Sequence, residues 1–526
     1  MIDLTRHFRI ACAAAAATFI GAAAQAAVPI EHWTLSSGAQ IYLARVATLP
    51  IVDVELDFDG GDRRDPSLQA GLASVTASIA EKAVRASEPM PEPPAASAPP
   101  VATPAASTST SPAAPTSPAV STSTAAPSDV PAAGAGVGVA EPVTGKPSAG
   151  ATDRIDLYGA AMDQNALGEA WADLGASFNI GAGGERLSFT LRTLADPLLL
   201  GKAVTLASRQ IGDPSFPADV WMRERERVSA ALREADTKPA TVASHAFAKA
   251  VYGDHPYAIR TTPESLARID VADMRAEYHR TAQPCRAKLT LVGAVTRAQA
   301  ESIALALLSR LPQDACTALP PVPDVASLTA AKNERIPFDS AQAHVLIGQP
   351  GYKRSDPDHF ALILGNYVLG GGGFVSRLTD EVREKRGLSY SVYSYFAPGL
   401  EAGAFRIGLQ TRPDQAEEAV KVSKSVLARF VAEGPTEAEL QAAKDNLIGG
   451  FPLLLDSNRK LLGNIANIAW YDLPLNYLET WTARMNAVTV ADVKAAFERK
   501  LQPERMVTVV VGAKSEAAAA SNAAKP

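Results

Sequence analysis

The stretch LGGGGFVSRLTDEVREKRGLSYSVYSYF, from Leu369 to Phe396, contains a glycine run, a helical pattern and a strand pattern in one order. Phe374, Leu378 and Val382 recur at four-residue spacing, which predicts a helix with one buried face. Gly387 then occupies the position where glycine commonly ends a helix. The stretch therefore predicts a glycine-led helix that turns directly into the next element.

A strand pattern follows the predicted helix. Leu388, Tyr390 and Val392 alternate with more polar residues, so we expect them on one face of a strand. Arg383 lies in the last turn of the helix, and this arrangement can aim its guanidinium and the Tyr390 phenol at one point. Two interpretations stay open from the residues alone. Either the pair takes part in chemistry, or the arginine only stabilises the negative end of the helix dipole and the tyrosine only packs against neighbouring strand residues.

The ordered features of this stretch resemble the C-terminal signature of the pitrilysin/insulinase (M16) family of zinc metallopeptidases. The resemblance extends, more loosely, over residues 28–512. In that family an arginine and a tyrosine separated by six residues reach the scissile region of the substrate. Arg383 and Tyr390 match that pair. The resemblance therefore implies that these two residues are catalytic.

The glycine run has two interpretations of its own. Gly371, Gly372 and Gly373 remove side chains and permit positive φ angles. They serve either as a flexible entry to the helix or for close backbone approach to a peptide substrate. A phosphate-binding loop is excluded because no strand leads into the glycines and no Lys-Ser/Thr pair follows them.

The resemblance breaks at the zinc motif. Active members carry H-x-x-E-H on a helix, because two imidazoles one turn apart face a single zinc ion and the glutamate activates its water. The corresponding helix, predicted after Asp65, has Ser74, Ala77 and Ser78 at the three functional positions. Hydroxyl and methyl groups cannot replace imidazole and carboxylate, so we expect no zinc site in this chain.

No second histidine pair replaces the motif, since the closest two of the seven histidines are ten residues apart. Glu224, Glu226 and Glu234 could include the family's third, carboxylate ligand, but interleaved arginines predict a solvated ion-pair face instead. We interpret His255, in a His-Pro-Tyr segment, as a structural loop residue. His359 is expected at the surface, near a helix cap.

The chain of 526 residues is too long for one core, and its net charge of −6 does not suggest nucleic-acid binding. Residues 271–293 match residues 490–512 without a gap, which predicts an internal duplication. We expect an α+β fold of two homologous halves, 28–312 and 333–513. Each half would be an antiparallel sheet packed against helices, and together they would form half of a clamshell.

Three segments fall outside this core. Residues 1–27 predict a signal peptide whose apolar region is too short to span a membrane, so we expect a periplasmic or secreted protein. Residues 86–152, rich in Ala, Pro, Ser and Thr, predict a disordered insertion, and residues 514–526 a disordered tail. Cys285 and Cys316 remain after export, either as a disulfide or as two free thiols.

These features predict a subunit that is inactive alone. It would supply Arg383 and Tyr390 as transition-state contacts for peptide hydrolysis, while a zinc-bearing homologue supplies the metal. No cofactor is expected in this chain, and neither nucleic acid nor a membrane span is expected. The alternative is a non-enzymatic peptide-binding or structural scaffold subunit of the same fold.

Overall fold

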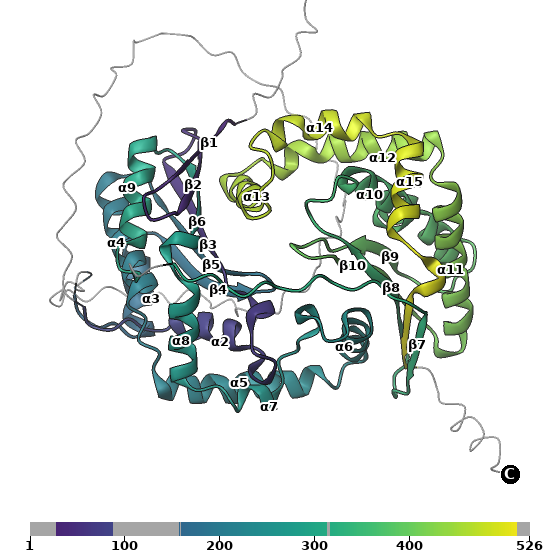
Figure 1. The fold of residues 1–526 in the computed structure, drawn as a ribbon, viewed down its shortest axis with the longest axis horizontal. Helices are drawn as coiled ribbons and strands as arrows, with labels where there is room; N and C mark the ends of the chain where they lie inside the picture. Colours follow the sequence, from purple (N-terminus) through teal and green to yellow (C-terminus); the bar gives the residue numbers. More distant parts are fainter. Residues whose placement is uncertain (1–27, 88–156, 158, 313–315, 513–526) are drawn as a thin grey trace, which may run out of the picture.

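The computed structural model describes residues 28–87, 157, 159–312 and 316–512. They form two sheets that lie side by side with helices around them (Figure 1). The predicted signal peptide, the predicted insertion beyond Ser87 and the predicted tail lie outside these residues. Of the helices within them, none has both the length and the apolar character required to cross a membrane.

The first half contains a six-stranded sheet in the order β1-β2-β6-β3-β5-β4. Its helices α4 and α9 pack against one face of this sheet, at the left of Figure 1. The elements are β1 (Ile30–Thr34), β2 (Gln40–Arg45), β3 (Ile51–Asp59), η1 (Asp62–Arg64), η2 (Ser67–Gln69), α2 (Leu72–Ala80), α3 (Gln164–Asp173), β4 (Ser177–Gly183), β5 (Arg186–Leu194), α4 (Pro197–Gly212), α5 (Ala218–Ala235), α6 (Pro239–Tyr252), η3 (Pro256–Ala258), α7 (Pro263–Leu266), α8 (Val271–Thr281), η4 (Pro284–Arg286), β6 (Lys288–Gly293) and α9 (Arg297–Leu308).

The second half contains a five-stranded sheet in the order β7-β11-β8-β10-β9. Helices α11 and α15 lie on its outer side, at the right of Figure 1. The elements are β7 (Lys332–Ile336), β8 (Ala343–Tyr352), α10 (His359–Asn366), η5 (Tyr367–Gly371), η6 (Gly373–Val375), η7 (Thr379–Glu384), β9 (Val392–Phe396), β10 (Gly403–Thr411), η8 (Pro413–Gln415), α11 (Ala416–Glu433), α12 (Glu437–Gly450), η9 (Phe451–Leu454), α13 (Asn458–Trp470), α14 (Tyr477–Ala487), α15 (Val490–Lys500), η10 (Pro503–Arg505) and β11 (Val507–Val511).

The predicted α+β class, with each half a sheet packed against helices, is confirmed. The sheets are mixed rather than purely antiparallel, because β2 pairs in parallel with β6 and β7 pairs in parallel with β11. β6 and β11 both arrive after a helix, α8 or α15. A strand that returns through such a crossover can be added in parallel, and strand alternation alone does not reveal this.

The two matching sequence segments fold alike. Both α8 and α15 begin with a capping box, continue through a short 3-10 turn and lead into a buried strand. A glycine with positive φ ends the first strand and directly follows the second, with φ of +147° at Gly293 and +102° at Gly512. A Cβ atom would lie 2.2 Å from the Ile51 carbonyl oxygen at the first and 2.6 Å from that of Gln342 at the second. Both turns therefore require glycine for the same physical reason.

One helix from each half packs against the sheet of the other half. Helix α6 of the first half packs Phe247 and Val251 against Leu346 of β8 and Val509 of β11. Helix α13 of the second half lies against β3 and β6 of the first sheet (Figure 1). This exchange, which the sequence did not predict, joins the two halves through two separate interfaces.

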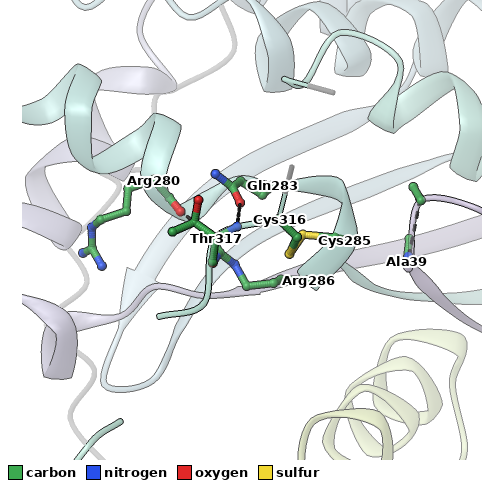
Figure 2. The surroundings of a disulfide bond; sticks show 8 residues. Ala39, Arg280, Gln283, Cys285, Arg286, Cys316 and Thr317 are labelled. Carbon is green, nitrogen blue, oxygen red and sulfur yellow. Dashed lines mark hydrogen bonds between the residues drawn. A yellow bond between two sulfur atoms is a disulfide. The ribbon is translucent and has the colours of Figure 1, made fainter. Parts of the chain in front are cut away.

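A disulfide between Cys285 and Cys316 joins the turn η4, just before β6, to the connection between the halves (Figure 2). Their Cα atoms are 6.0 Å apart, so of the two open interpretations the structure shows the disulfide. Beside it, the Thr317 backbone N–H donates to Gln283 Oε1 at 3.4 Å, and Arg286 donates to the Thr317 carbonyl. The connection is thus held against the first half.

His255 holds the same connection further along. Its Nδ1 accepts the Tyr257 backbone N–H at 3.1 Å, so its Nε2 carries the proton and donates to the Pro323 carbonyl at 2.8 Å. Both ring nitrogens are therefore engaged by the backbone. The interpretation of His255 as a structural loop residue is confirmed.

The chain leaves and re-enters the first half at one point on either side of residues 88–156. The Ser87 backbone N–H donates to the Gly159 carbonyl at 3.0 Å. The buried guanidinium of Arg209 donates to the carbonyls of Arg85 and Ala160 at 3.1 and 2.6 Å. The two flanks are thus fixed to each other by the body of the protein.

Replacement of residues 88–156 by a Gly/Ser linker of about six residues is expected to leave the fold intact. Because a shorter loop costs less closure entropy, the free energy of unfolding should stay equal or rise by up to about 2 kcal/mol. Urea unfolding measures this difference. Arg209→Met, which removes the donors to the flanking carbonyls, is the destabilising control. A deletion variant as unstable as that control would contradict the expectation.

Candidate functional site

Helix α2 contains the three positions at which the resemblance implies a zinc motif. It begins after Gly71, and the buried carboxylate of Asp65 accepts the backbone N–H groups of Gly71 and Ala73 at 2.7 and 2.9 Å. Burial raises the pKa of Asp65 to about 7, and the nearby negative charge of Asp62 adds to this. Hydrogen bonds from its own chain therefore organise the start of this helix.

The three motif positions of α2 carry side chains that do not suit zinc. Ser74 Oγ donates to Asp62 Oδ1 at 2.7 Å, Ala77 is buried, and Ser78 is half-buried. Zinc sites in proteins use cysteine sulfur, histidine nitrogen or carboxylate oxygen. Throughout the described ranges, no group of three or more such residues is arranged to hold a metal ion. The residues at this position thus do not fit the metal that the resemblance implies.

The glutamates of α5 face solvent or pair with neighbouring cations. Glu224 accepts from Arg227 Nε at 2.8 Å, and this hydrogen bond is the main cause of its lowered pKa. Glu234 pairs with Lys238 at 3.1 Å, and Glu226 is exposed. These contacts agree with the ion-pair face predicted for this helix.

The glycine-rich stretch of the second half is a series of short turns. Helix α10 continues into the π-helix η5, and the 3-10 turn η6 separates it from the π-helix η7. Leu378 and Val382 are fully buried, as predicted, but Phe374 is 71% exposed. The prediction that Phe374 continues the buried face is wrong. Gly373, with φ of +60°, turns the chain before the second helix begins.

The glycines of this stretch differ in what requires them. A Cβ atom on Gly371 would lie 2.7 Å from Asn366 Nδ2, and one on Gly372 would lie 2.8 Å from the Tyr367 carbonyl oxygen. Internal packing therefore accounts for these two. Gly373 needs its positive φ, and a Cβ there would meet nothing within 4 Å. Their contact with a substrate stays a prediction.

Tyr390 stands out from the surface just before β9. Its side chain is 88% exposed, whereas Leu388 and Val392 are buried. The predicted strand is wrong for Leu388 and Tyr390 and correct for Val392, because β9 begins only at Val392. Before it, the Ser391 backbone N–H donates to Ser389 Oγ at 3.2 Å and closes a local turn. That turn directs the tyrosine outward.

Arg383 lies one turn before Gly387, whose N–H donates to the Arg383 carbonyl at 2.8 Å. Its guanidinium carbon is 4.6 Å from the ring centroid of Phe374, and its Nε is 3.3 Å from Glu384 Oε1. The side chain keeps 34% of its surface exposed. Phe374, which the sequence pattern assigned to the core, thus supports the arginine through a cation–π contact.

The interface between α13 and the first sheet contains buried acids. Asp53, Glu55 and Asp57 lie on one face of β3. Arg192 pairs with Asp53 at 3.1 Å, and Arg186 with Asp57 at 3.1 Å and Glu55 at 3.8 Å. Burial, and next the charge of Asp57, raise the pKa of Glu55 to about 7. At Glu55 burial therefore outweighs the nearby arginine, and the charged form of this side chain is disfavoured at the interface with α13.

Glu55→Gln is expected to stabilise the protein at pH 8 by up to about 3 kcal/mol and to change little at pH 5. The Glu55 pKa rises from 4.5 to about 7 on folding, and each unit corresponds to about 1.36 kcal/mol. The folded state takes up this proton before the unfolded chain does, so stability falls as pH rises from 4.5 through 7. Urea unfolding at both pH values tests this, with Glu226→Gln as exposed control. A Glu55→Gln variant that changed the free energy of unfolding equally at pH 5 and pH 8 would contradict this prediction.

Two cavities meet at Tyr471. The first, which we call the β4 pocket, has a volume of about 460 Å³ and opens beside the edge strand β4. The second, the Arg354 pocket, has a volume of about 270 Å³. The β4 pocket is lined by Gly181, Ala182, Gly183, Glu185, Arg186, Ser188 and Tyr471, and the Arg354 pocket by Arg354, Pro398, Asn464, Asn467, Ile468, Tyr471, Leu473 and Tyr477.

His359 is not the surface residue that was predicted. It is buried at the start of α10, and its Nδ1 is 3.0 Å from the Tyr352 hydroxyl. Burial, followed by the positive charges of Arg354 and Arg484, lowers its pKa to about 3. The prediction failed because a histidine near a helix cap can equally pack inward when a tyrosine supplies its partner.

Residues 268–447 match a family model described as the peptidase M16 inactive domain. An uncharacterized zinc protease of Streptomyces coelicolor is 36% identical over 168 residues, which are 32% of this chain and only 36% of that protein. A second, of Mycobacterium leprae, is 28% identical over 72% of this chain and 86% of its own length. A non-peptidase homolog of Helicobacter pylori is 25% identical over 65% and 81%.

A solved structure shows a similar fold over nearly the whole chain. It is the crystal structure of a peptidase M16 inactive domain from Pseudomonas fluorescens, with a TM-score of 0.74 and 29% sequence identity. The alignment covers 92% of this chain and 98% of that one. The arrangement of both halves is therefore shared with that protein.

Proposed function

We propose that this chain, a member of the M16 peptidase family, is the metal-free subunit of an exported two-chain peptidase. It would present Arg383 and Tyr390 to a peptide held with a zinc-bearing homologue. The exposure of Tyr390 carries the proposal, because a large aromatic side chain that is 88% exposed between two buried residues has no packing role of its own. Arg383, whose guanidinium carbon lies 4.6 Å from the Phe374 ring centroid, is the cation seven positions earlier in the chain.

The two side chains suit one step of peptide hydrolysis. Attack on a peptide carbonyl places negative charge on its oxygen, and donors aimed at that oxygen lower the barrier. The guanidinium of Arg383 supplies N–H donors, and the phenol of Tyr390 supplies an O–H donor. This chain would thus contribute hydrogen-bond donors, and activation of the water would belong to the partner.

Export is part of the proposal. Residues 1–27 have the pattern of a signal peptide, and the Cys285–Cys316 disulfide is typical of oxidising compartments such as the periplasm. Fractionation of cells that express the full chain tests this directly. Recovery of the protein with free thiols in the cytoplasm would contradict it.

Reconstitution tests the division of labour. The purified chain, a homologue that retains H-x-x-E-H, and their mixture are each incubated with a fluorogenic peptide library. We expect cleavage only by the mixture, sensitive to chelation, together with co-elution of the two chains on gel filtration. Metal-dependent cleavage by this chain alone would refute the proposal. A homologue whose motif glutamate is replaced by Gln controls for contaminating proteases.

A peptide-binding or structural scaffold without catalysis is the second candidate. The relative named a non-peptidase homolog favours it, and so does the β4 pocket, where an edge strand could pair with an extended peptide. The mixture discriminates between the two. A scaffold would support activity equally well after Arg383 and Tyr390 are replaced, whereas a catalytic subunit would not.

A further inference from the structure

Arg354, which follows β8, is a half-buried arginine without an ion-pair partner among the described residues. Its guanidinium donates to the Tyr477 hydroxyl at 2.8 Å. The guanidinium carbon lies 5.2 Å from the Tyr477 ring centroid and 5.9 Å from that of Tyr471. The Arg354 guanidinium thus lies near two aromatic rings at the wall of a cavity. Its N–H groups other than the one bonded to Tyr477 remain as donors for a ligand.

Other donors surround the same cavity. Asn467 Oδ1 accepts from Arg186 at 2.5 Å, so its amide N–H groups are the part of that side chain left for a ligand. Tyr471 has its ring centroid 5.8 Å from the Arg186 guanidinium carbon, and its hydroxyl is a further O–H donor at this cavity. Arginine, tyrosine and asparagine donors thus meet at the Arg354 pocket, and no aspartate or glutamate lines it.

We propose that the Arg354 pocket binds a carboxylate group of a peptide. A guanidinium presents its N–H groups in a planar fork that matches the two oxygens of a carboxylate. The choice of a peptide rests on the proposed function and on Tyr471, which the pocket shares with the β4 pocket. The carboxylate belongs either to the C-terminus of the peptide or to an acidic side chain.

The volume of the pocket agrees with this ligand. About 270 Å³ accommodates a carboxylate with one attached side chain, and not a folded domain. Gly181 and Gly183 of the neighbouring β4 edge leave open space where side chains would stand. A peptide bound along the β4 edge would reach Tyr471, and the carboxylate of the peptide would then lie in the Arg354 pocket on the other side of Tyr471.

Isothermal titration of the full chain, without any partner, tests the proposal. The probes are the tetrapeptide acetyl-Ala-Ala-Ala-Phe as free acid, its C-terminal amide, and the amide of acetyl-Ala-Asp-Ala-Phe. We expect the free acid to bind at least about tenfold more tightly than its amide, a difference of about 1.4 kcal/mol. Tight binding of the Asp peptide amide as well would show that the pocket accepts either kind of carboxylate, which also supports the proposal.

Arg354→Gln should abolish the preference for the acid. Arg406→Gln is the matched control, because Arg406 also lies over a tyrosine ring, at 4.7 Å from that of Tyr395, and does not line the pocket. Equal binding of acid and amide by the unmodified chain would overturn the proposal whether or not the variants fold. So would undetectable binding of the acid at millimolar concentration, or competition by inorganic phosphate at the concentration of the acid. These failures leave the roles of Arg383 and Tyr390 untouched.

Discussion

Arg383→Ala and Tyr390→Phe, each in the reconstituted two-chain peptidase, are expected to lower kcat by about 10²–10³-fold. Both remove a donor to an oxygen that becomes negatively charged only during the reaction, so KM should change little. Neither side chain supports the core, since Tyr390 is 88% exposed and Arg383 contacts Phe374 and Glu384 at the surface. The melting temperature of the chain should therefore remain unchanged. Steady-state kinetics on a fluorogenic peptide measures the loss.

Matched variants show whether the loss of kcat is specific to Arg383 and Tyr390 or follows from removing any nearby surface arginine or tyrosine hydroxyl. Arg386→Ala removes an arginine near the end of the same helix that pairs with Glu381, and Tyr393→Phe removes a hydroxyl next to the same turn. Both should keep near-normal kcat. Phe374→Leu should give an intermediate loss, because Arg383 keeps its charge and loses its support. Full activity of Tyr390→Phe would exclude the phenol as a donor and favour the scaffold.

In the stretch from Leu369 to Phe396, the sequence pattern predicted the end of the helix correctly and the positions of two aromatic side chains wrongly. Gly387 was expected to end the helix, and its φ of +62° agrees. Phe374 was assigned to the buried face of a regular helix, and Tyr390 to a regular strand, because periodicity alone does not show where the chain leaves the pattern. Both are exposed. Local rules fail most often at functional sites, and here the two failures flank Arg383, the residue for which chemistry is proposed.

The parts of the fold that depend on neighbouring residues in the sequence could be predicted. Helix caps, a short turn and a strand-ending glycine repeat at the same spacing in both halves, so the duplication could be read from the sequence. The exchange of α6 and α13 has no such signal. The contacts of Glu185 with the second half have no such signal either. Glu185 accepts from the Leu400 backbone N–H at 2.8 Å and from Trp470 Nε1 at 3.2 Å, and both of these partners lie more than 200 residues away.

Removal of the disulfide should have the largest effect on stability. The Cys285–Cys316 bond closes a loop with a sequence separation of 31 residues, which contains β6 and α9. In the chain-entropy account, a loop of this length corresponds to about 3–4 kcal/mol. Cys285→Ser with Cys316→Ser should therefore lower the free energy of unfolding by that amount. Urea unfolding under oxidising conditions measures it.

Reducing agent provides the internal control, because it should destabilise the unmodified protein by the same amount and leave the double variant unaffected. β6 lies between β2 and β3, so loosening its start should weaken the first sheet as a whole rather than the connection alone. His255, bonded to the Pro323 carbonyl, would still hold the connection further along. Hydrogen exchange that rose only next to the cysteines, with unchanged urea unfolding, would show that the bond restrains the connection and not the sheet.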